Sequence, residues 1–271
     1  MHPLRLERDG AVATVVLDRP AQRNALDLAL KVALREALGE VAADEGVRAV
    51  VLTGGPEAFC VGQDLAEHAA ALAEGPAFDT VTEHYNPVVT ALATMPKPVV
   101  AAVAGPCVGA GLGLALACDL RLWSTTARLG TAFSGIGLTC DSGLSTTLVR
   151  AVGEQRAREL VLLAQPFGPD EAVAWGLGGR VVEPDALLEE ATALARRLAA
   201  GPTAAYAESK RLLADAAAGR PLAETLAAEA AAQVRLGATA DHAGAVASFL
   251  AKQRPTFEGR QAPERLSPGA P

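Results

Sequence analysis

The stretch PKPVVAAVAGPCVGAGLGLALACDL, residues 96–120, decides the fold of this chain of 271 residues. The run from Pro98 to Cys118 carries no charge and is long enough to cross a bilayer. However, Gly105-Pro106 interrupts the run, and alanine supplies much of the rest. A strand that is covered on both faces reads as a continuous apolar run. The stretch therefore predicts a buried strand over 99–103, a glycine-rich turn and a buried helix through 112–118, rather than a membrane span.

Outward from this stretch, short apolar runs alternate with helical patterns. An Asp9-Gly10 turn between 4–8 and 11–17 predicts a hairpin, and Asp27 is a candidate N-cap for a helix to residue 43. Further strands are expected over 48–53, 119–123 and 179–182. The other expected helices cover 64–74, 79–94, 144–151, 154–164, 170–175, 185–200, 203–218, 222–236 and 241–252. These patterns predict an α/β core over 1–200, a helical region over 201–254 and a loose tail over 255–271.

Charge and cysteine usage narrow the classes of function. The chain has 24 Lys plus Arg against 31 Asp plus Glu and no basic cluster, which argues against a nucleic-acid partner. Its four cysteines show no CxxC spacing, so we expect buried thiols in a reducing compartment and no metal site. The opening residues MHPLRLERDG carry charges where a signal peptide needs apolar residues, which predicts a cytoplasmic protein.

Two glycine-containing turns are candidates for chemistry. Gly109-Ala110-Gly111-Leu112-Gly113 follows a predicted strand and opens a predicted helix, but Leu114 breaks the GxGxxG spacing of a dinucleotide-binding turn. Such a turn presents backbone N–H groups at a helix N-terminus, where negative charge is stabilised. AFCVGQDL, residues 58–65, lies in a similar context. Two donors converging on one carbonyl oxygen would make an oxyanion hole, whereas either turn taken alone favours a simple tight turn.

Taken together, AFCVGQDL and the 96–120 stretch resemble the enoyl-CoA hydratase/isomerase (crotonase) superfamily, with RNAL at 23–26 and RAVVLTGG at 48–55 in the expected order. The resemblance covers about residues 4 to 260. AFSGIGLTCDSG (132–143) and SFLAKQRPTFEGR (248–260) are most similar to 1,2-epoxyphenylacetyl-CoA isomerases. The resemblance implies a crotonase-type spiral of repeated ββα units with a C-terminal helical oligomerisation region. It also implies a homotrimer or hexamer that acts on acyl-CoA thioesters, with coenzyme A as part of the substrate and no other cofactor.

The resemblance also implies catalytic roles. The backbone N–H groups of Gln63 and Ala110 would be the oxyanion donors. Gly113 and Phe133 stand where hydratases of this family carry two glutamates, so simple hydration lacks its acid and base. Asp141 would serve instead as a single acid/base, as in isomerases of the family. Apart from the resemblance, the position of Asp141 favours a cap for the helix that follows it over a catalytic role.

Further residues are implied in binding the substrate. Arg23 would approach the phosphates of coenzyme A, and Phe249 and Lys252 would reach in from the C-terminal helix, although Arg23 and Lys252 could also be solvated surface charges. The other implied binding residues are Ala25, Ala58, Asp64, Leu65, Asn86, Gly109 and Phe133.

Besides the isomerisation of an acyl-CoA, three other functions stay open. The first is weak hydration through a different residue. The second is a dehalogenase-like reaction in which Asp141 attacks an aromatic ring, for which Asn86 stands where a histidine is expected. The third is a catalytically inactive acyl-CoA-binding protein.

Overall fold

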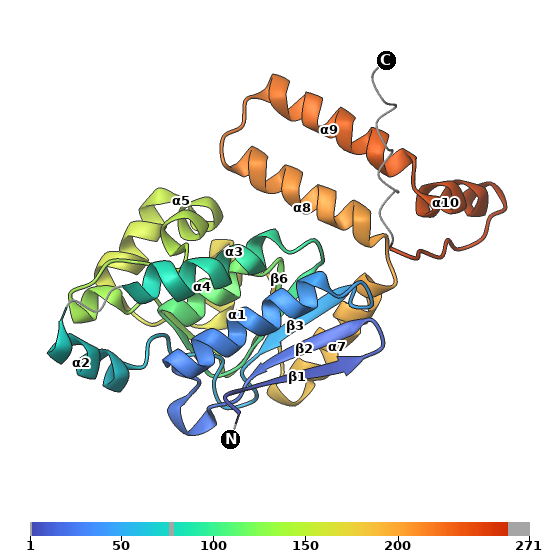
Figure 1. The fold of residues 1–271 in the computed structure, drawn as a ribbon. Helices are drawn as coiled ribbons and strands as arrows, with labels where there is room; N and C mark the ends of the chain where they lie inside the picture. Colours follow the sequence, from blue (N-terminus) through green and yellow to red (C-terminus); the bar gives the residue numbers. More distant parts are fainter. Residues whose placement is uncertain (1, 76–78, 260–271) are drawn as a thin grey trace, which may run out of the picture.

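The computed structural model describes residues 2–75 and 79–259 (Figure 1). Its main sheet has the order β1-β2-β3-β4-β6-β8, so spatial order follows chain order. β1 (Leu4–Asp9) and β2 (Val12–Leu17) form the predicted antiparallel hairpin. β3 (Ala49–Thr53), β4 (Val99–Val103), β6 (Leu120–Ser124) and β8 (Arg180–Val182) continue the sheet in parallel.

A second, two-stranded parallel sheet lies beside the main one. It consists of β5 (Pro106–Val108) and β7 (Arg128–Gly130), neither of which the sequence predicted. Their shortness explains the miss, because three residues show no periodicity and Gly105-Pro106 reads as a turn. The charge-free run at 98–118 thus becomes β4, β5 and a buried helix, and no helix in the described part of the chain is long and apolar enough to cross a membrane.

Helices cover both faces of the main sheet, which explains its continuous apolar strands. In β3, Ala49 and Val51 pack against α7 (Leu187–Ala199), whereas Val50 and Leu52 belong to the larger core on the other side. α7 presents residues at four-residue spacing to the sheet, namely Leu187, Ala191, Ala195 and Ala199. The opposite face is covered by α1 (Leu28–Ala43), α3 (Asn86–Thr94) and α4 (Ala110–Ala117).

Most predicted helices are present, and two differ in detail. Asp27 caps α1 as predicted, accepting from the Leu30 N–H at 2.9 Å. The helix expected at 79–94 divides into a π-helical turn, η2 (Val81–Tyr85), and α3, because Pro87 has no N–H to donate to the Glu83 carbonyl. α5 (Leu144–Leu163) is interrupted at Gly153, which confirms that two helices meet there. α2 (Leu65–Glu74), η3 (Phe133–Ile136) and α6 (Pro169–Trp175) complete the core.

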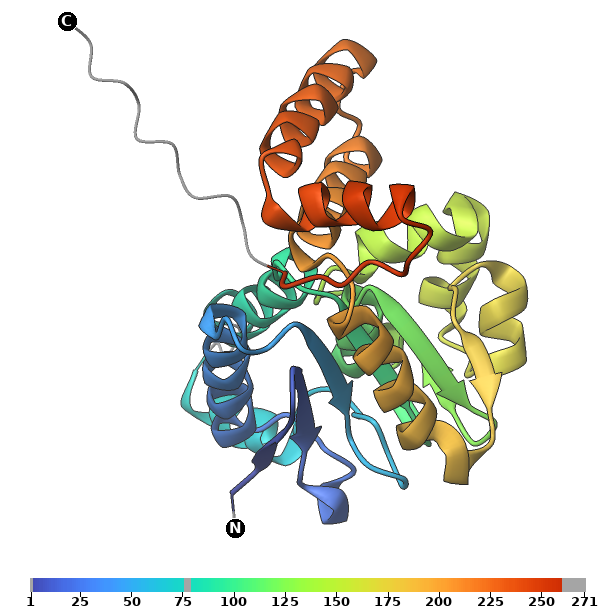
Figure 2. The same ribbon diagram turned by 90° about the vertical axis from the view of Figure 1, so that its right-hand side faces the viewer.

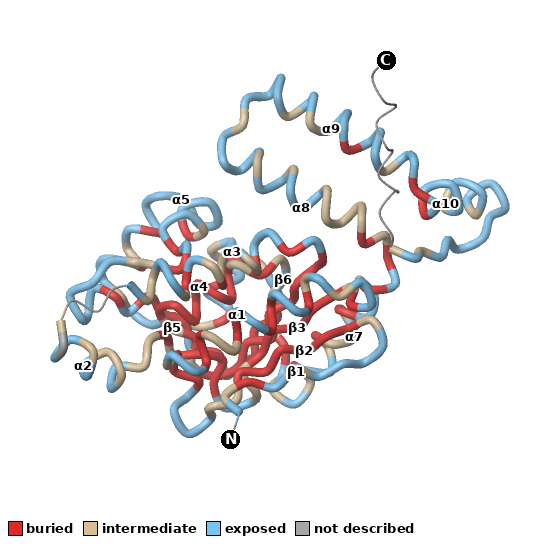
Figure 3. Tube along the Cα trace, in the orientation of Figure 1, coloured by how far each residue is buried: buried red, intermediate tan, exposed pale blue. Residues whose placement is uncertain are grey.

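The last three helices form an arm that projects from this core (Figure 2). They are α8 (Thr203–Ala217), α9 (Leu222–Gly237) and α10 (Ala240–Leu250), and few of their residues are buried (Figure 3). Arg48, just before β3, donates to the carbonyls of Gly201 at 2.6 Å and Phe257 at 2.8 Å. One side chain of the core therefore holds both the entry to the arm and the segment that follows it.

The expectation of a loose tail does not describe residues 255–259. Besides the Arg48 bond to Phe257, the carboxylate of Asp241 accepts from the N–H groups of Glu258 at 2.7 Å and Gly259 at 2.9 Å. Residues 260–271 of the expected tail lie outside the described residues. Of the four cysteines, Cys60, Cys107 and Cys118 are buried free thiols and Cys140 is half-buried.

Candidate active site

A cavity of about 410 Å³ opens between α2, η2, the start of α4 and the turn before α5. Its walls are largely apolar, with polar groups gathered from a few loops. It is lined by Ala25, Val61, Gly62, Gln63, Leu65, His68, Thr80, Val81, Tyr85, Val108, Gly109, Ala110, Thr131, Ala132, Phe133, Ile136, Leu138 and Asp141. An apolar cavity with a few polar groups is typical of a small-molecule site.

The first glycine turn brings Gln63 to this cavity. The turn pairs with the segment before α1, since Leu26 donates to the Gly62 carbonyl at 2.8 Å and Asp64 donates to the Leu26 carbonyl at 3.2 Å. These bonds use the carbonyl of Gly62 and the N–H of Asp64, the residues on either side of Gln63. Among the described residues, the Gln63 backbone N–H has no hydrogen-bond acceptor.

The second turn brings Ala110 beside the first. Ala110 begins α4, so its N–H has no partner within the helix, and it has none elsewhere in the described part of the chain. The two turns approach closely because Gly111 has no side chain: a Cβ there would lie 2.8 Å from the carbonyl carbon of Cys60. A Cβ on Gly62 would lie 3.3 Å from the Ala110 nitrogen. Two unpaired amides thus line the same cavity.

Asp141 supplies a carboxyl group to this cavity. The group is half-buried, and the Ser142 hydroxyl donates to its Oδ1 at 2.8 Å. Burial raises the pKa of Asp141, and the Ser142 hydrogen bond offsets part of that rise. The alternative of a helix cap is wrong, because α5 has Gly143 as its N-cap residue and no side-chain cap. Three apolar residues line the cavity together with Asp141, namely Phe133, Ile136 and Leu138.

Gly113 and Phe133 take up the places where the resemblance implies glutamates. Phe133 is buried and lines the cavity, while Gly113 lies in α4 against Ser142. Among the residues that line the cavity, Asp141 is the only one with a carboxyl group. His68 also lines the cavity and has an interaction partner, whereas His84 lies behind the wall, where burial lowers its pKa.

The remaining predicted binding residues divide into two groups. Ala25, Leu65 and Gly109 line the cavity. Ala58 and Asp64 do not, because the Ala58 carbonyl accepts from a buried amide and the Asp64 carboxylate caps α2.

Four predicted binding residues have exposed side chains away from the cavity lining. The side chain of Arg23 makes no hydrogen bond or ion pair with the described residues. Asn86, expected to line the acyl pocket, lies instead on an exposed side of α3. Phe249 lies in α10 and Lys252 just after it, and neither lines the cavity; α10 projects away from α2, whose first residue lines it (Figure 1).

Two polar residues near the cavity were missed by the sequence analysis. Asn24 is fully buried, and its Nδ2 donates to the carbonyls of Gly54 at 2.8 Å, Ala58 at 2.8 Å and Phe59 at 3.1 Å. It thereby fixes the loop that leads to Gln63. Lys31 is buried on α1 behind the cavity wall. The signal for Lys31 was a lysine three residues before Leu34, inside the apolar stripe of α1.

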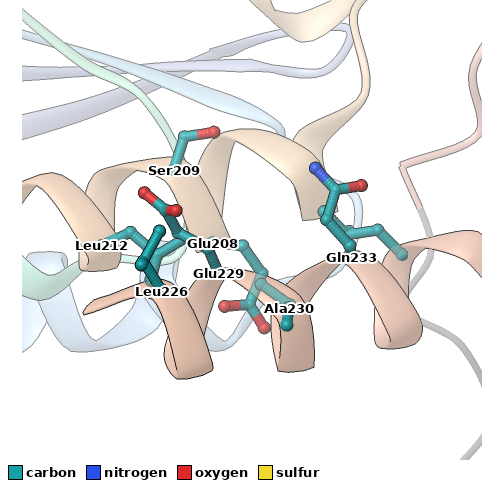
Figure 4. A pocket seen from close by; sticks show the side chains of 9 residues that line it. Glu208, Ser209, Leu212, Leu226, Glu229, Ala230 and Gln233 are labelled. Atoms are coloured by element: carbon teal, nitrogen blue, oxygen red, sulfur yellow. The ribbon is translucent and has the colours of Figure 1, made fainter. Parts of the chain in front are cut away.

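A second hollow of similar volume lies in the arm between α8 and α9 (Figure 4). Glu208 on α8 and Glu229 on α9 are its two carboxylates, and they point in different directions. Glu208 is ion-paired, since hydrogen bonds from Arg235 and then Arg211 lower its pKa to about 2. A carboxylate of that pKa is a poor proton acceptor near neutrality, so we place the chemistry in the first cavity.

Comparison with known proteins agrees with this geometry. The family model for enoyl-CoA hydratase/isomerase matches residues 7–260. The chain is 41% identical to a probable enoyl-CoA hydratase of Rhodobacter capsulatus, over 96% of this chain and 99% of that protein. It is 37% identical to the 1,2-epoxyphenylacetyl-CoA isomerase of Escherichia coli, over 92% and 95% of the two chains. A crystal structure of a protein described as an enoyl-CoA hydratase/isomerase from Mycobacterium abscessus superposes with a TM-score of 0.91 at 49% identity, covering 95% and 100% of the two chains.

The sheet, the projecting helices and the paired unsatisfied amides define a protein of the crotonase fold, an enzyme that processes acyl-CoA thioesters. The chain belongs to the enoyl-CoA hydratase/isomerase family.

Proposed function

We propose that this chain is an acyl-CoA isomerase that shifts a double bond or opens a ring epoxide through a thioester enolate. The observation that carries the proposal is that Asp141 shares one cavity with the unpaired N–H groups of Gln63 and Ala110. The N–H pair would hold the thioester oxygen while charge develops on it, each donor contributing about 2.7–4 kcal/mol by analogy with measured oxyanion-hole losses. Asp141 would carry the proton.

The reaction needs one acid/base group. In a double-bond shift, the Asp141 carboxylate removes a proton from the α-carbon and the C–H electron pair moves onto the thioester oxygen. The same carboxyl group then returns the proton to the γ-carbon, which leaves the double bond between the α- and β-carbons. With a ring epoxide, the enolate electrons instead form the α,β double bond and break the carbon–oxygen bond at the β-carbon; the oxygen stays bonded to the neighbouring ring carbon and takes the proton from Asp141. Burial raises the pKa of Asp141, which makes its carboxylate a stronger proton acceptor.

Asp141→Asn tests this assignment, with β,γ-unsaturated and ring-epoxide CoA esters as substrates. We expect turnover to be lost while CoA-ester binding, measured by calorimetry, stays close to wild type. Asp79→Asn is the matched control, since Asp79 is an exposed carboxylate beside the cavity residue Thr80 and should retain full activity. Full activity in Asp141→Asn would rule out the proposed role.

Hydration is the principal alternative. Adding water needs one group that activates water and another that protonates carbon, and the cavity lining offers the single carboxyl group of Asp141. We therefore expect little loss of enone absorbance from crotonyl-CoA. Rapid loss would favour a hydratase, and acyl-CoA binding without turnover of any ester would favour a binding protein. A dehalogenase-like reaction is less well supported, because Asn86 lies outside the cavity lining.

We also propose that coenzyme A enters past Ala25 and Leu65, with the exposed Arg23 near its phosphates, and that it serves only as part of the substrate. The arm would then be the surface of a homotrimer, alone or paired into a hexamer. Its support is a set of exposed apolar residues, which are Leu213, Leu222, Leu226, Val234, Phe249 and Leu250. Light scattering should give three or six times the chain mass of 27.6 kDa, and a monomer would contradict this assembly.

A further inference from the structure

A buried ammonium group lies directly behind the cavity wall. Lys31 on α1 leaves 4% of its side chain exposed, and its Nζ lies 2.9 Å from Glu67 Oε1 and 2.9 Å from Thr80 Oγ1. The third partner is Gln63 Oε1, at 3.4 Å. Burying a charge is costly unless it is paired and hydrogen-bonded, and these partners meet that requirement.

The side-chain amide of Gln63 is held at both ends by this group of residues. Its Oε1 accepts from the Tyr85 hydroxyl as well as from Lys31. Its Nε2 donates to Glu67 Oε1 at 3.3 Å, and the same Glu67 oxygen also binds Lys31. Because the side chain and backbone of one residue share a Cα, clamping the amide restricts rotation of the backbone N–H that lines the cavity.

The same ammonium joins three separate elements. Lys31 belongs to α1, Glu67 to α2, and Thr80 and Tyr85 to the segment around η2. Thr80, Tyr85 and Gln63 line the cavity, whereas Lys31 and Glu67 stand behind them. The ring of Tyr85 lies 5.8 Å from the Lys31 ammonium, within the range of a cation–π contact. Lys31 therefore reaches the substrate site only through its neighbours.

We propose that Lys31 is a positioning residue for the oxyanion hole: by clamping the Gln63 side chain against Glu67 and Tyr85, it fixes the direction of the Gln63 backbone N–H. This inference rests on the proposed function, because it requires that this N–H binds the thioester oxygen. It also assigns the clamp a second effect, which is to hold α2 and residues 80–85 as one wall of the acyl cavity.

Lys31→Met is the first test, because methionine keeps the length of the side chain and removes the charge. We expect kcat to fall about tenfold with KM nearly unchanged, less than the roughly hundredfold loss that follows deletion of a donor. Lys97→Met is the matched control. Lys97 is an equally buried lysine whose Nζ donates to the carbonyls of Val41 at 2.6 Å and Asp44 at 2.5 Å, away from the cavity.

Both lysine variants should lose stability, but only Lys31→Met should lose kcat. A similar kcat in Lys31→Met and wild type would overturn the proposal. Gln63→Leu gives a second, independent measurement, since it keeps the backbone N–H and removes the clamped amide. If Lys31 acts through that amide, Lys31→Met lowers kcat in the wild-type background and has little further effect in the Gln63→Leu background. Equal losses in both backgrounds would also overturn it.

The infrared stretch of a bound thioester carbonyl separates this inference from the proposed reaction. Butanoyl-CoA labelled with carbon-13 at the carbonyl is a suitable probe, because it has no double bond to shift. In the wild-type chain the stretch should move to lower frequency on binding; Lys31→Met should reduce that shift and Lys97→Met should keep it. An equal shift in Lys31→Met overturns the positioning role alone. No shift in the wild type overturns both the oxyanion hole and the role of Lys31.

Discussion

Gly113 in α4 and Ser142 beside the proposed base are packed so closely that a Cβ atom at position 113 would lie 2.5 Å from the Ser142 Cβ. It would also lie 2.8 Å from the Ser142 carbonyl oxygen. Non-bonded carbon atoms are in favourable contact at about 3.5–4.0 Å. The turn that carries Asp141 therefore occupies the space that any side chain at 113 would need. A carboxylate on α4 at this position and Asp141 in its present place exclude each other.

Gly113→Ala should consequently destabilise the fold by about 1–3 kcal/mol, the usual cost of overpacking a well-packed site. Gly39→Ala is the matched control, because Gly39 is also helical and a Cβ there meets nothing within 4 Å. That change should stabilise the protein by roughly 0.5–1 kcal/mol. Urea unfolding of both variants measures the difference, and equal effects would contradict the close packing.

Ser142→Ala should move the acidic limb of the pH–rate profile to higher pH. The hydroxyl of Ser142 stabilises the ionised form of Asp141, and burial raises the pKa of that group. Removing the donor leaves burial unopposed, so the base loses its proton only at a higher pH. The profile of kcat/KM measures this shift. Ser145→Ala, which removes an exposed hydroxyl from the same helix region, should leave the limb where it is.

Asp141→Asn should make the folded protein more stable at pH 7 while it removes activity. The folded-state pKa of Asp141 is raised above its ordinary value of 3.8, so folding binds a proton more tightly there. The wild type therefore loses stability as pH rises from about 4 through the folded-state pKa. The asparagine variant has no such loss, and the difference in unfolding free energy should vanish below about pH 4. A variant that is less stable at pH 7 would show that burial does not disfavour the carboxylate.

Asn24→Asp should destabilise the fold by more than 3 kcal/mol, because it replaces donors facing three carbonyls with an acceptor in a fully buried place. The nearby loop that ends at Gln63 should loosen first. Hydrogen exchange of residues 54–65 measures that opening. Asn86→Asp is the control at an exposed amide, and it should change stability by less than about 0.5 kcal/mol.

The sequence predicted the long elements of this fold well, for a physical reason. Strands such as β3 and β4 are buried on both faces, so their apolar runs are unbroken, and helices such as α1 carry a cap and a clear apolar stripe. The short strands β5 and β7 could not be predicted, because they are defined by pairing between segments about 20 residues apart.

The site was only partly predictable. The resemblance to the crotonase superfamily implied donors at Gln63 and Ala110, and both residues line the cavity together with Asp141. The placement of Asn86 could not be foreseen, because a one-residue change in helical phase turns a side chain away from a cavity. The clamp around Lys31 was missed because its partners come from three elements, and no linear spacing encodes such a meeting.

The order of strands in the main sheet bears on how the chain is made. Because every strand pairs with the one before it in the sheet's sequence, a nascent chain emerging from the ribosome can lengthen the sheet one edge at a time. The bond from Arg48 to Phe257 joins residues 209 positions apart and can close only after residue 257 has left the ribosome. The direction in which the arm projects is thus fixed only after all the strands of the sheet have been synthesised.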